Sequence, residues 1–346
     1  MIKISVIVPF YKVSEADFRR CVDSLKAQTL DGVEFIFVDD RGPDDEPRRL
    51  LAESAANDSR FKLLAQERNG GVSAARNRGL DAASGYYVAF VDADDSVAPD
   101  FLEKLYLASG SGAADMVFSN IELTNDSGSI IGRFGEFCDL TVRELSDGGL
   151  ARLCRHMPWT VIGKLFRTAA ALRFDPAMFF GEDKDFTARS LPGVRRYAAI
   201  SAAPYSYRTG SVHSAMRKSV FSASTVEQIF RFCATLKRSA RRLPEDWRLA
   251  RAAFGRELFD ASLVRFAVNR KNLSPEVCRL WLEHIGEFWM DVTVADRFFP
   301  PFLTALLALT ARRPRLLQVF FPPLFLAFRL WWKFRLEARL AEKLSA

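Results

Sequence analysis

The first ninety residues alternate short apolar segments with amphipathic ones, and this alternation constrains the fold more than any other feature. The pattern predicts strands at Ile2–Pro9, Val33–Val38, Phe61–Ala65 and Tyr86–Val91, and helices at Asp17–Gln28 and Pro47–Ala56. Strands that alternate with helices form βαβ units, and hence a parallel sheet with helices on both faces. In such sheets ligands bind outside the carboxyl ends of the strands. We therefore predict an α/β fold with a Rossmann-like, mostly parallel sheet whose functional rim lies where the strands end.

Polar side chains follow the predicted strands at that rim, namely Tyr11, Asp39, Asp40, Asp92, Asp94 and Asp95. Carboxylates clustered at a strand end repel one another unless a cation lies between them. Hard divalent ions such as Mg2+ take oxygen ligands and share them with substrate phosphates. Upstream, an Asn-Gly-Gly loop opens a short helical stretch that carries Arg76, and a guanidinium suits phosphate oxygens. Segment 69–95 therefore predicts a metal–diphosphate site, whereas a lone Asp-x-Asp is also typical of a surface turn.

The N-terminal half resembles the family 2 glycosyltransferases of the GT-A fold in four blocks: S-V-I-V-P-F-Y, E-F-I-F-V-D-D, N-G-G-V-S-A-A-R-N-R-G and F-V-D-A-D-D. A further block at Gly163–Phe186, which ends in F-F-G-E-D-K-D-F, is similar to the family's acceptor-side segment. Pro204–Arg208 resembles the strand that often closes the domain. The resemblance implies a GT-A catalytic domain over residues 1–215 and an inverting transfer from a nucleotide-diphosphate sugar.

The resemblance also implies nucleotide-sugar contacts for Pro9, Tyr11, Asp39, Asp40, Arg76, Asp92 and Ala93. Within this set, Tyr11 is expected to stack on the base and Asp40 to accept a hydrogen bond from it. Arg76 is expected to approach the diphosphate. Asp92 is expected near the ribose or the water shell of the metal, and Asp94 as the direct ligand of Mn2+ or Mg2+.

The implied reaction needs a second set of carboxylates. An acceptor hydroxyl attacks the anomeric carbon while the nucleotide diphosphate departs, and a carboxylate must take the hydroxyl's proton. A metal and an arginine stabilise the charge that develops on the leaving group. Glu182 and Asp183 supply the second set. The resemblance makes Asp183 the general base, with Glu182 as the alternative because the two are adjacent; a solvated helix start is the other interpretation of this pair.

Two further residues are candidates for the site. The resemblance suggests that His213 approaches the diphosphate, and a histidine in a surface loop is the alternative. Trp159 precedes the acceptor-side segment and is a candidate platform on which a sugar stacks, with a core tryptophan as the alternative.

Composition narrows the class of protein and its compartment. The five cysteines form no Cys-x-x-Cys pair, which predicts reduced, buried thiols on the cytosolic side of a cell. No signal peptide is expected at the N-terminus. The net charge of +7 is modest, and the acidic rim argues against a nucleic-acid partner.

The C-terminal third differs in character from the rest. Residues 216–297 predict a helical subdomain. Residues 298–346 combine apolar and aromatic runs with arginine and lysine, and neither run reaches the roughly 20 residues that a bilayer span needs. This composition, with the Trp331-Trp332 pair, favours an element in a membrane interface where acidic headgroups attract the basic side chains. A helical subdomain packed on the catalytic domain, or on a second subunit of a homo-oligomer, is the alternative.

The sequence as a whole predicts a metal-dependent inverting glycosyltransferase. Its donor would be a nucleotide-diphosphate sugar, with UDP as the expected nucleotide, and its acceptor a glycan or glycolipid hydroxyl in surface polysaccharide or lipopolysaccharide-type biosynthesis. The enzyme is expected in the cytoplasm, peripherally bound at the inner membrane surface. An inactive nucleotide-sugar-binding or scaffold protein is the alternative, and the intact Asp94 and Asp183 favour the enzyme. A sugar nucleotidyltransferase would require a Gly-rich loop directly after the first strand, where Pro-Phe-Tyr-Lys stands instead.

Overall fold

The computed structural model describes residues 1–135, 137–170, 172–209 and 223–244, together with Trp247, Ala250, Ser274 and Glu276. The chain divides into two compact units, Met1–Val220 with Ala234–Ala250, and Phe221–Cys233 with Arg251–Ala346. The predictions for His213 and for segment 298–346 lie outside the described residues. Among the described residues, we find no helix whose length and apolar character would let it cross a bilayer.

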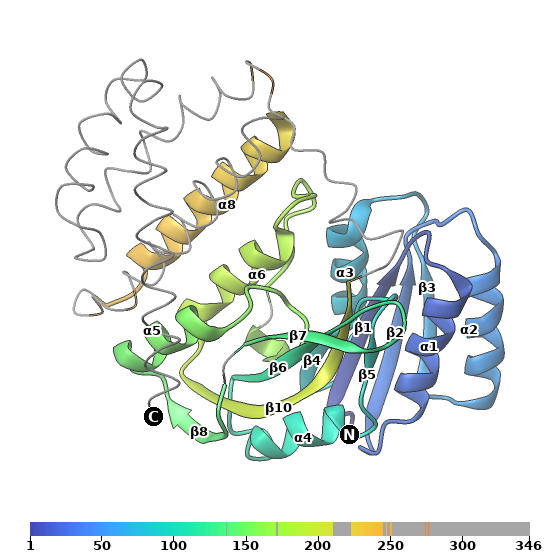
Figure 1. Cartoon of the computed structure of the whole chain (residues 1–346), viewed down its shortest axis with the longest axis horizontal. Helices are drawn as coiled ribbons and strands as arrows, with labels where there is room; N and C mark the ends of the chain where they lie inside the picture. The colour runs from blue at the N-terminus through green and yellow to red at the C-terminus, as the bar shows by residue number, and fades with distance from the viewer. Residues whose placement is uncertain are drawn as a thin grey trace. The chain divides into compact units, whose positions relative to one another are not determined.

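A mixed sheet forms the centre of the first unit, and ten of its strands lie within the described residues (Figure 1). Its strands are β1 Ile4–Phe10, β2 Val33–Asp39, β3 Phe61–Ala65, β4 Tyr87–Phe90, β5 Ser96–Val97, β6 Met116–Thr124, β7 Ile130–Phe134, β8 Leu140–Glu144, β9 Lys164–Arg167 and β10 Arg196–Arg208. They are ordered β3-β2-β1-β4-β9-β6-β10-β5, with β7 paired to β6 and β8 paired to β10.

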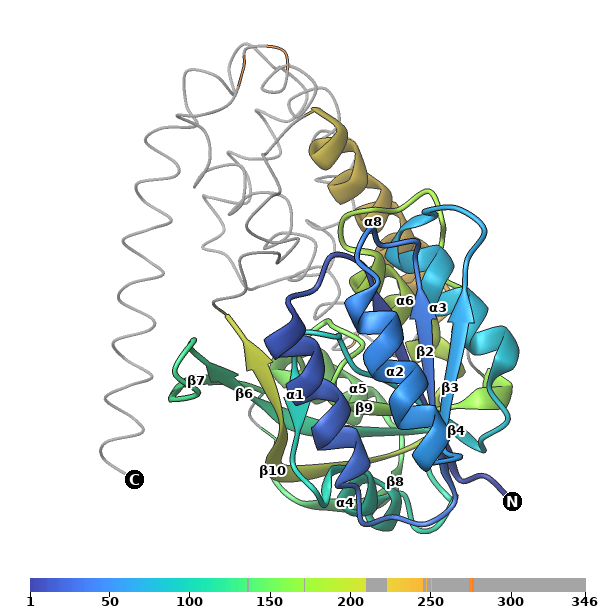
Figure 2. The ribbon, with the colours of Figure 1, turned by 90° about the vertical axis from the view of Figure 1, so that its right-hand side faces the viewer.

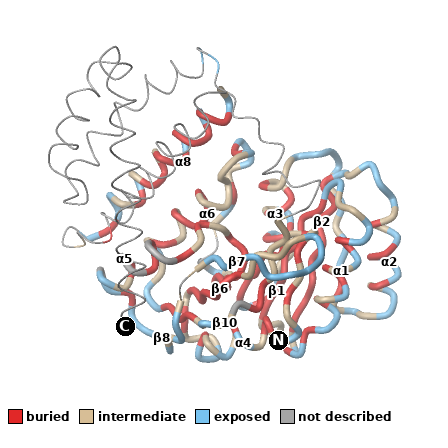
Figure 3. Tube along the Cα trace, viewed as in Figure 1, coloured by how far each residue is buried: buried red, intermediate tan, exposed pale blue. Residues whose placement is uncertain are grey.

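The four strands predicted in the first 91 residues are present and pair in parallel. Strands β1 and β2 are buried along their whole length (Figure 3), as expected of strands covered on both faces. Beyond β4 the sheet becomes mixed, because β9 pairs antiparallel with both β4 and β6. The predicted α/β class is confirmed, and its all-parallel part, β3-β2-β1-β4, is the segment in which strands and helices alternate.

Helices cover both faces of the parallel strands. The helices of the described residues are α1 Glu15–Lys26, α2 Glu46–Asn57, α3 Gly71–Ala82, α4 Phe101–Ala108, α5 Asp147–His156, α6 Glu182–Ser190 and α8 Ala223–Arg241, with short 3-10 turns at Thr168–Ala170 and Leu191–Gly193. Helices α1 and α2 lie side by side on one face (Figure 2). Helix α3 lies tightly on β1, where a Cβ added to Gly79 would stand only 2.4 Å from Cγ2 of Ile7. This close approach places the polar residues of α3 directly beside the carboxyl ends of the strands.

Candidate active site

The two carboxylates at the end of β2 hold loops of the rim. Asp39 is fully buried and accepts hydrogen bonds from the backbone N–H of Gly42 at 3.0 Å and from Nε of Arg48 at 2.6 Å. The Arg48 guanidinium also donates to the Gly42 carbonyl. Asp39 therefore fixes the loop that follows β2.

Asp40 fixes the start of α3. Its carboxylate accepts from the backbone N–H groups of Gly70 at 2.7 Å and Gly71 at 2.9 Å, and from Nε2 of Gln66 at 2.6 Å. Pro9 is buried within β1, and Tyr11 follows that strand with 44% of its surface exposed. Tyr11 thus presents an aromatic face at the rim, and the contacts of Asp40 and Tyr11 with a base remain predictions.

The turn at Asp92–Asp95 is anchored by β10. The Tyr205 hydroxyl accepts from the backbone N–H of Asp92 at 3.1 Å and donates to Oδ2 of Asp95 at 2.7 Å. The backbone N–H of Arg208 donates to Oδ1 of Asp95 at 2.9 Å. Asp95 is only 1% exposed, and burial, together with the charges of Asp92 and Asp94, raises its pKa well above the ordinary value. Asp95 thus holds the turn in place, and the assignment of Asp94 as the metal ligand stays a prediction.

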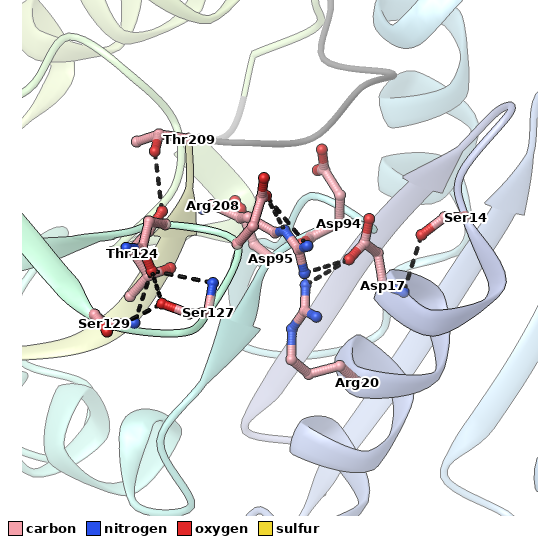
Figure 4. Close-up of polar contacts among 12 residues, drawn as sticks. Ser14, Asp17, Arg20, Asp94, Asp95, Thr124, Ser127, Ser129, Arg208 and Thr209 are labelled. Atoms are coloured by element: carbon pink, nitrogen blue, oxygen red, sulfur yellow. Dashed lines mark hydrogen bonds and ion pairs between the residues drawn. The ribbon is translucent and has the colours of Figure 1, made fainter.

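A second anchor reaches the same turn from α1 (Figure 4). Nη2 of Arg20 donates to Oδ1 of Asp17 at 2.8 Å and to the backbone carbonyl of Asp94 at 3.1 Å. Nη1 of Arg208 lies 2.6 Å from the same Asp17 oxygen. Burial acts to raise the pKa of Asp17, but hydrogen bonds from Ser14 and Arg20 and the charge of Arg208 lower it below the ordinary value. Asp17 is therefore an ionised link between the closing strand and the backbone of Asp94.

The donor set at this turn fits a metal only in part. Among the described residues, no group of three or more His, Cys, Asp or Glu side chains is arranged to hold an ion. Ions such as Mg2+ are commonly bound through one or two carboxylates plus substrate phosphates. Asp92 and Asp94 are partly exposed hard-oxygen ligands, so they suit an ion whose coordination a diphosphate completes. They do not form a cage that would hold an ion by protein ligands alone.

Arg76 joins the donor-side turn to α6. Its Nη2 lies 3.0 Å from Oδ1 of Asp92, and its Nη1 lies 3.0 Å from Oε1 of Glu182. The side chain is 5% exposed, and its guanidinium carbon lies 5.3 Å from the centre of the Phe174 ring. Burial and the neighbouring Asp183 raise the pKa of Glu182, while Arg76 acts in the opposite direction. Arg76 is thus engaged with two carboxylates, and its contact with a diphosphate stays a prediction.

The first turn of α6 carries three carboxylates in different settings. Glu182 is held by Arg76, and Asp185 is buried and bonded to Nε of Arg189 at 2.7 Å. Asp183 is partly exposed and accepts the backbone N–H of Lys184 at 2.8 Å, and it forms no ion pair among the described residues. Asp183 is therefore the carboxylate of this turn best placed to receive a proton.

Helix α3 also fastens the segment that leads into α6, which the sequence did not reveal. The Ser73 hydroxyl donates to the Met178 carbonyl at 3.0 Å. The Asn77 side chain accepts the Phe174 N–H at 2.8 Å and donates to the Phe174 carbonyl at 2.9 Å. Asn77 lies one helical turn beyond Ser73, so the two side chains share a face. Helix α3, which carries the predicted phosphate ligand Arg76, thus also positions the acceptor-side segment.

Trp159 is 5% exposed, which supports the core alternative for this residue. The loop around it is held by Lys164, whose Nζ is buried and donates to the carbonyls of Pro158 at 2.9 Å and Thr160 at 2.7 Å. Burial lowers the pKa of Lys164 to about 7. The Thr187 hydroxyl of α6 donates to the same Thr160 carbonyl at 3.3 Å. Lys164 therefore stabilises the loop at residues 158–160, to which α6 is hydrogen-bonded through Thr187.

Several known proteins are similar to this chain in sequence. The model of the family described as "Glycosyl transferase family 2" matches residues 5–177. The putative glycosyltransferase EpsH of Bacillus subtilis (strain 168) is 39% identical over 117 residues, which cover 34% of this chain and 33% of the relative. The succinoglycan biosynthesis protein ExoO of Rhizobium meliloti (strain 1021) is 30% identical over 208 residues, 57% of this chain and 59% of ExoO. The chain thus spans less than two thirds of the length of either relative.

A solved structure shows the same fold. The crystal structure of S. aureus TarS 1-349 superposes with a TM-score of 0.71 at 22% sequence identity, and covers 90% of this chain and 88% of TarS 1-349. A structure of the same TarS fragment in complex with UDP-GlcNAc matches with the same score. This likeness confirms the predicted GT-A type of α/β fold.

Proposed function

The chain belongs to glycosyltransferase family 2, and from this we propose that it transfers a sugar, with inversion, from a nucleotide-diphosphate sugar to a hydroxyl group. One observation carries the proposal. Arg76 binds Asp92 on the donor side and Glu182 on the acceptor side, each at 3.0 Å, so both sets of carboxylates belong to one site. A binding or scaffold protein would not require a partly exposed carboxylate, Asp183, beside such a bridge.

The acceptor side supplies the base. Asp183 would accept the proton of the acceptor hydroxyl as its oxygen attacks the anomeric carbon. The bond between that carbon and the diphosphate oxygen breaks, and the diphosphate leaves on the opposite face. Since Glu182 is committed to Arg76, the geometry favours Asp183 over Glu182 for this role.

The donor side receives the leaving group. Asp94, with Asp92 beside it, would hold Mn2+ or Mg2+, and such an ion stabilises the negative charge that develops on a diphosphate. The anchors of this turn, Tyr205 and Arg20, fix the backbone at Asp92 and Asp94 before the donor binds. A preorganised site of this kind needs no rearrangement as the charge develops.

The nature of the donor and acceptor is part of the proposal. The TarS fragment has been crystallised with UDP-GlcNAc and with UDP, which supports a UDP-sugar donor. ExoO is described as a succinoglycan biosynthesis protein, which supports a glycan or glycolipid acceptor in surface polysaccharide synthesis. We place the enzyme at the cytoplasmic face of the membrane because segment 298–346 combines apolar and basic residues. A contact between subunits of a homo-oligomer is the alternative use of that segment.

A thermal-shift screen of nucleoside diphosphates with and without Mn2+ tests the donor side. A ligand that binds the folded state raises the melting temperature, and at a given concentration a tighter ligand raises it more. Asp94→Ala should abolish the Mn2+-dependent part of the shift. Asp183→Asn should keep the shift while sugar transfer falls by roughly 100-fold or more, the usual size of a general-base effect. Asp31→Asn, at an exposed carboxylate outside the site, is the matched control. Loss of the nucleotide response in Asp183→Asn, or wild-type transfer by Asp94→Ala, would contradict the assignments.

A further inference from the structure

The loop that leads into α6 is held at both of its ends. On one side Met178 is buried, and its carbonyl accepts the Ser73 hydroxyl at 3.0 Å. On the other side Glu182 is bonded to Arg76 at 3.0 Å. Gly181 between them has a φ of 75°, a left-handed conformation that favours glycine and turns the chain into the helix. The loop is therefore a fixed part of the site, and Figure 1 shows it at the end of α6 that faces the start of α3.

Phe179 lies on this fixed loop with 61% of its surface exposed. Isolated exposed apolar residues are normal on protein surfaces, so exposure alone means little. Among the described residues, the other exposed aromatic side chains, Tyr11, Tyr86 and Phe134, show 42–44% of their surface. Phe179 exposes more than any of them and stands four residues before Asp183, on a backbone that is anchored on either side.

The position restricts what can cover this ring. An acceptor hydroxyl must come within hydrogen-bond reach of Asp183, so the sugar that carries it lies within a few ångströms of the first turn of α6. A pyranose ring presents a face of C–H groups, and such groups pack on the electron-rich face of an aromatic ring. The tryptophan that the sequence offered for this purpose, Trp159, is buried. Phe179 is the exposed aromatic residue nearest to Asp183 in the sequence.

We propose that Phe179 is a platform for the acceptor, on which a hexopyranose ring packs with one hydroxyl directed at Asp183. This inference rests on the proposed function and adds the chemical class of the acceptor group next to the base. Packing of this kind binds the ground state and the transition state alike, so its loss raises KM more than it lowers kcat. A residue with a purely structural role would lower the stability or the nucleotide response as well.

The test uses the full-length protein and the nucleotide sugar whose nucleotide gives the largest thermal shift. The acceptor probes are methyl α- and β-pyranosides of glucose, galactose, mannose and N-acetylglucosamine. Phe179→Ala should raise the KM of the accepted glycoside about 10-fold, as expected for one ring contact, while kcat, hydrolysis of the donor by water and the nucleotide thermal shift stay near wild type. Phe179→Tyr and Phe179→Trp should restore KM, and Phe179→Leu should not, because it lacks a flat face.

Leu107 of α4 is the matched control, because it is 64% exposed and lies outside the site. Leu107→Ala should leave every readout unchanged. An unchanged KM in Phe179→Ala, or full recovery in Phe179→Leu, overturns the platform. A wild-type enzyme that hydrolyses the donor but transfers to none of the glycosides overturns the hexopyranose acceptor and leaves the proposed function standing. A wild-type protein that neither binds nor hydrolyses any nucleotide sugar refutes the proposed function itself.

Discussion

Replacing Arg76 by methionine is the sharpest test of how the site is held together. Methionine preserves most of the length and the apolar contact with Phe174, but it removes both ion pairs. Two carboxylates then lose their counter-charge. Asp92 has 32% of its side chain exposed, so water can solvate it, whereas Glu182 has 14% exposed. The main cost should therefore come from Glu182.

The magnitude follows from that burial. Breaking a buried pair from one side costs about 3–5 kcal/mol, because a charge is left uncompensated. We expect Arg76→Met to lose roughly 3 kcal/mol at pH 7, the lower end of that range, since Asp92 remains partly hydrated. Glu182→Gln alone should cost about 1–2 kcal/mol, the loss of one charged hydrogen bond. The double variant lacks the charges of both Arg76 and Glu182. Its loss in free energy of unfolding should therefore be smaller than the sum of the two single losses by about 2 kcal/mol.

The pH dependence gives an independent check. Burial and Asp183 already raise the pKa of Glu182, and removing Arg76 raises it further. A carboxyl whose pKa is higher in the folded than in the unfolded state binds more protons when folded, so stability returns as the pH falls through the folded pKa. The defect of Arg76→Met should therefore be smaller at pH 5 than at pH 7. Urea unfolding of the four proteins at both pH values measures this, and a coupling below about 0.5 kcal/mol or a defect that does not shrink at pH 5 would refute the reasoning.

Further predictions concern the two other charge clusters and the C-terminal segment. Asp17→Asn should cost about 2–4 kcal/mol in urea unfolding, because Arg208 loses its buried partner, and it should weaken the Mn2+-dependent nucleotide shift through Asp94; an unchanged Mn2+ response would contradict the link. Glu34 is buried, which acts to raise its pKa, but hydrogen bonds from Lys62, Ser5 and Ser84 lower it to about 2. The stability that the ionised Glu34 contributes is present above pH 4.5 and is lost as the pH falls toward 2. Glu34→Gln should therefore lower the free energy of unfolding by about 1–3 kcal/mol at pH 7. The free energy of unfolding of this variant should also fall less steeply with decreasing pH than that of the wild type. Full-length protein should co-sediment with anionic vesicles, less so at high salt and less after glutamine replaces Arg312, Arg313 and Arg315; protein that stays in the supernatant would favour the packed-subdomain alternative.

The sequence predicted the parallel half of the sheet and its rim because both depend on local patterns. Alternating strands and helices place the ends of β1, β2 and β4 at one edge, so Tyr11, Asp40 and Asp92 meet there. The mixed half was not foreseen in detail, because β9 inserts between β4 and β6 from a distant part of the chain. For Trp159 the sequence left both a sugar platform and a core residue possible, because burial depends on tertiary contacts that a local pattern does not show.

The roles of individual carboxylates could not be read from the sequence, because each is decided by a partner far along the chain. Asp95 is buried and bonded to Tyr205 and Arg208, which lie 110 and 113 positions away. Glu182 is bonded to Arg76, at a separation of 106 positions, whereas Asp183 accepts the backbone N–H of Lys184. A motif shows which acidic residues are present, but not which of them the fold neutralises.

This pattern of neutralisation is itself an argument for catalysis. Acidic residues gathered at one rim repel one another and would also repel a diphosphate. Asp95 is buried and accepts hydrogen bonds from Tyr205 and Arg208, and Glu182 is paired with Arg76. Asp94 and Asp183 stay partly exposed on either side of that bridge. An in-line transfer needs one carboxylate for the metal beneath the leaving group and one for the acceptor proton on the opposite side. Under the proposed function, Asp94 and Asp183 would fill these two roles.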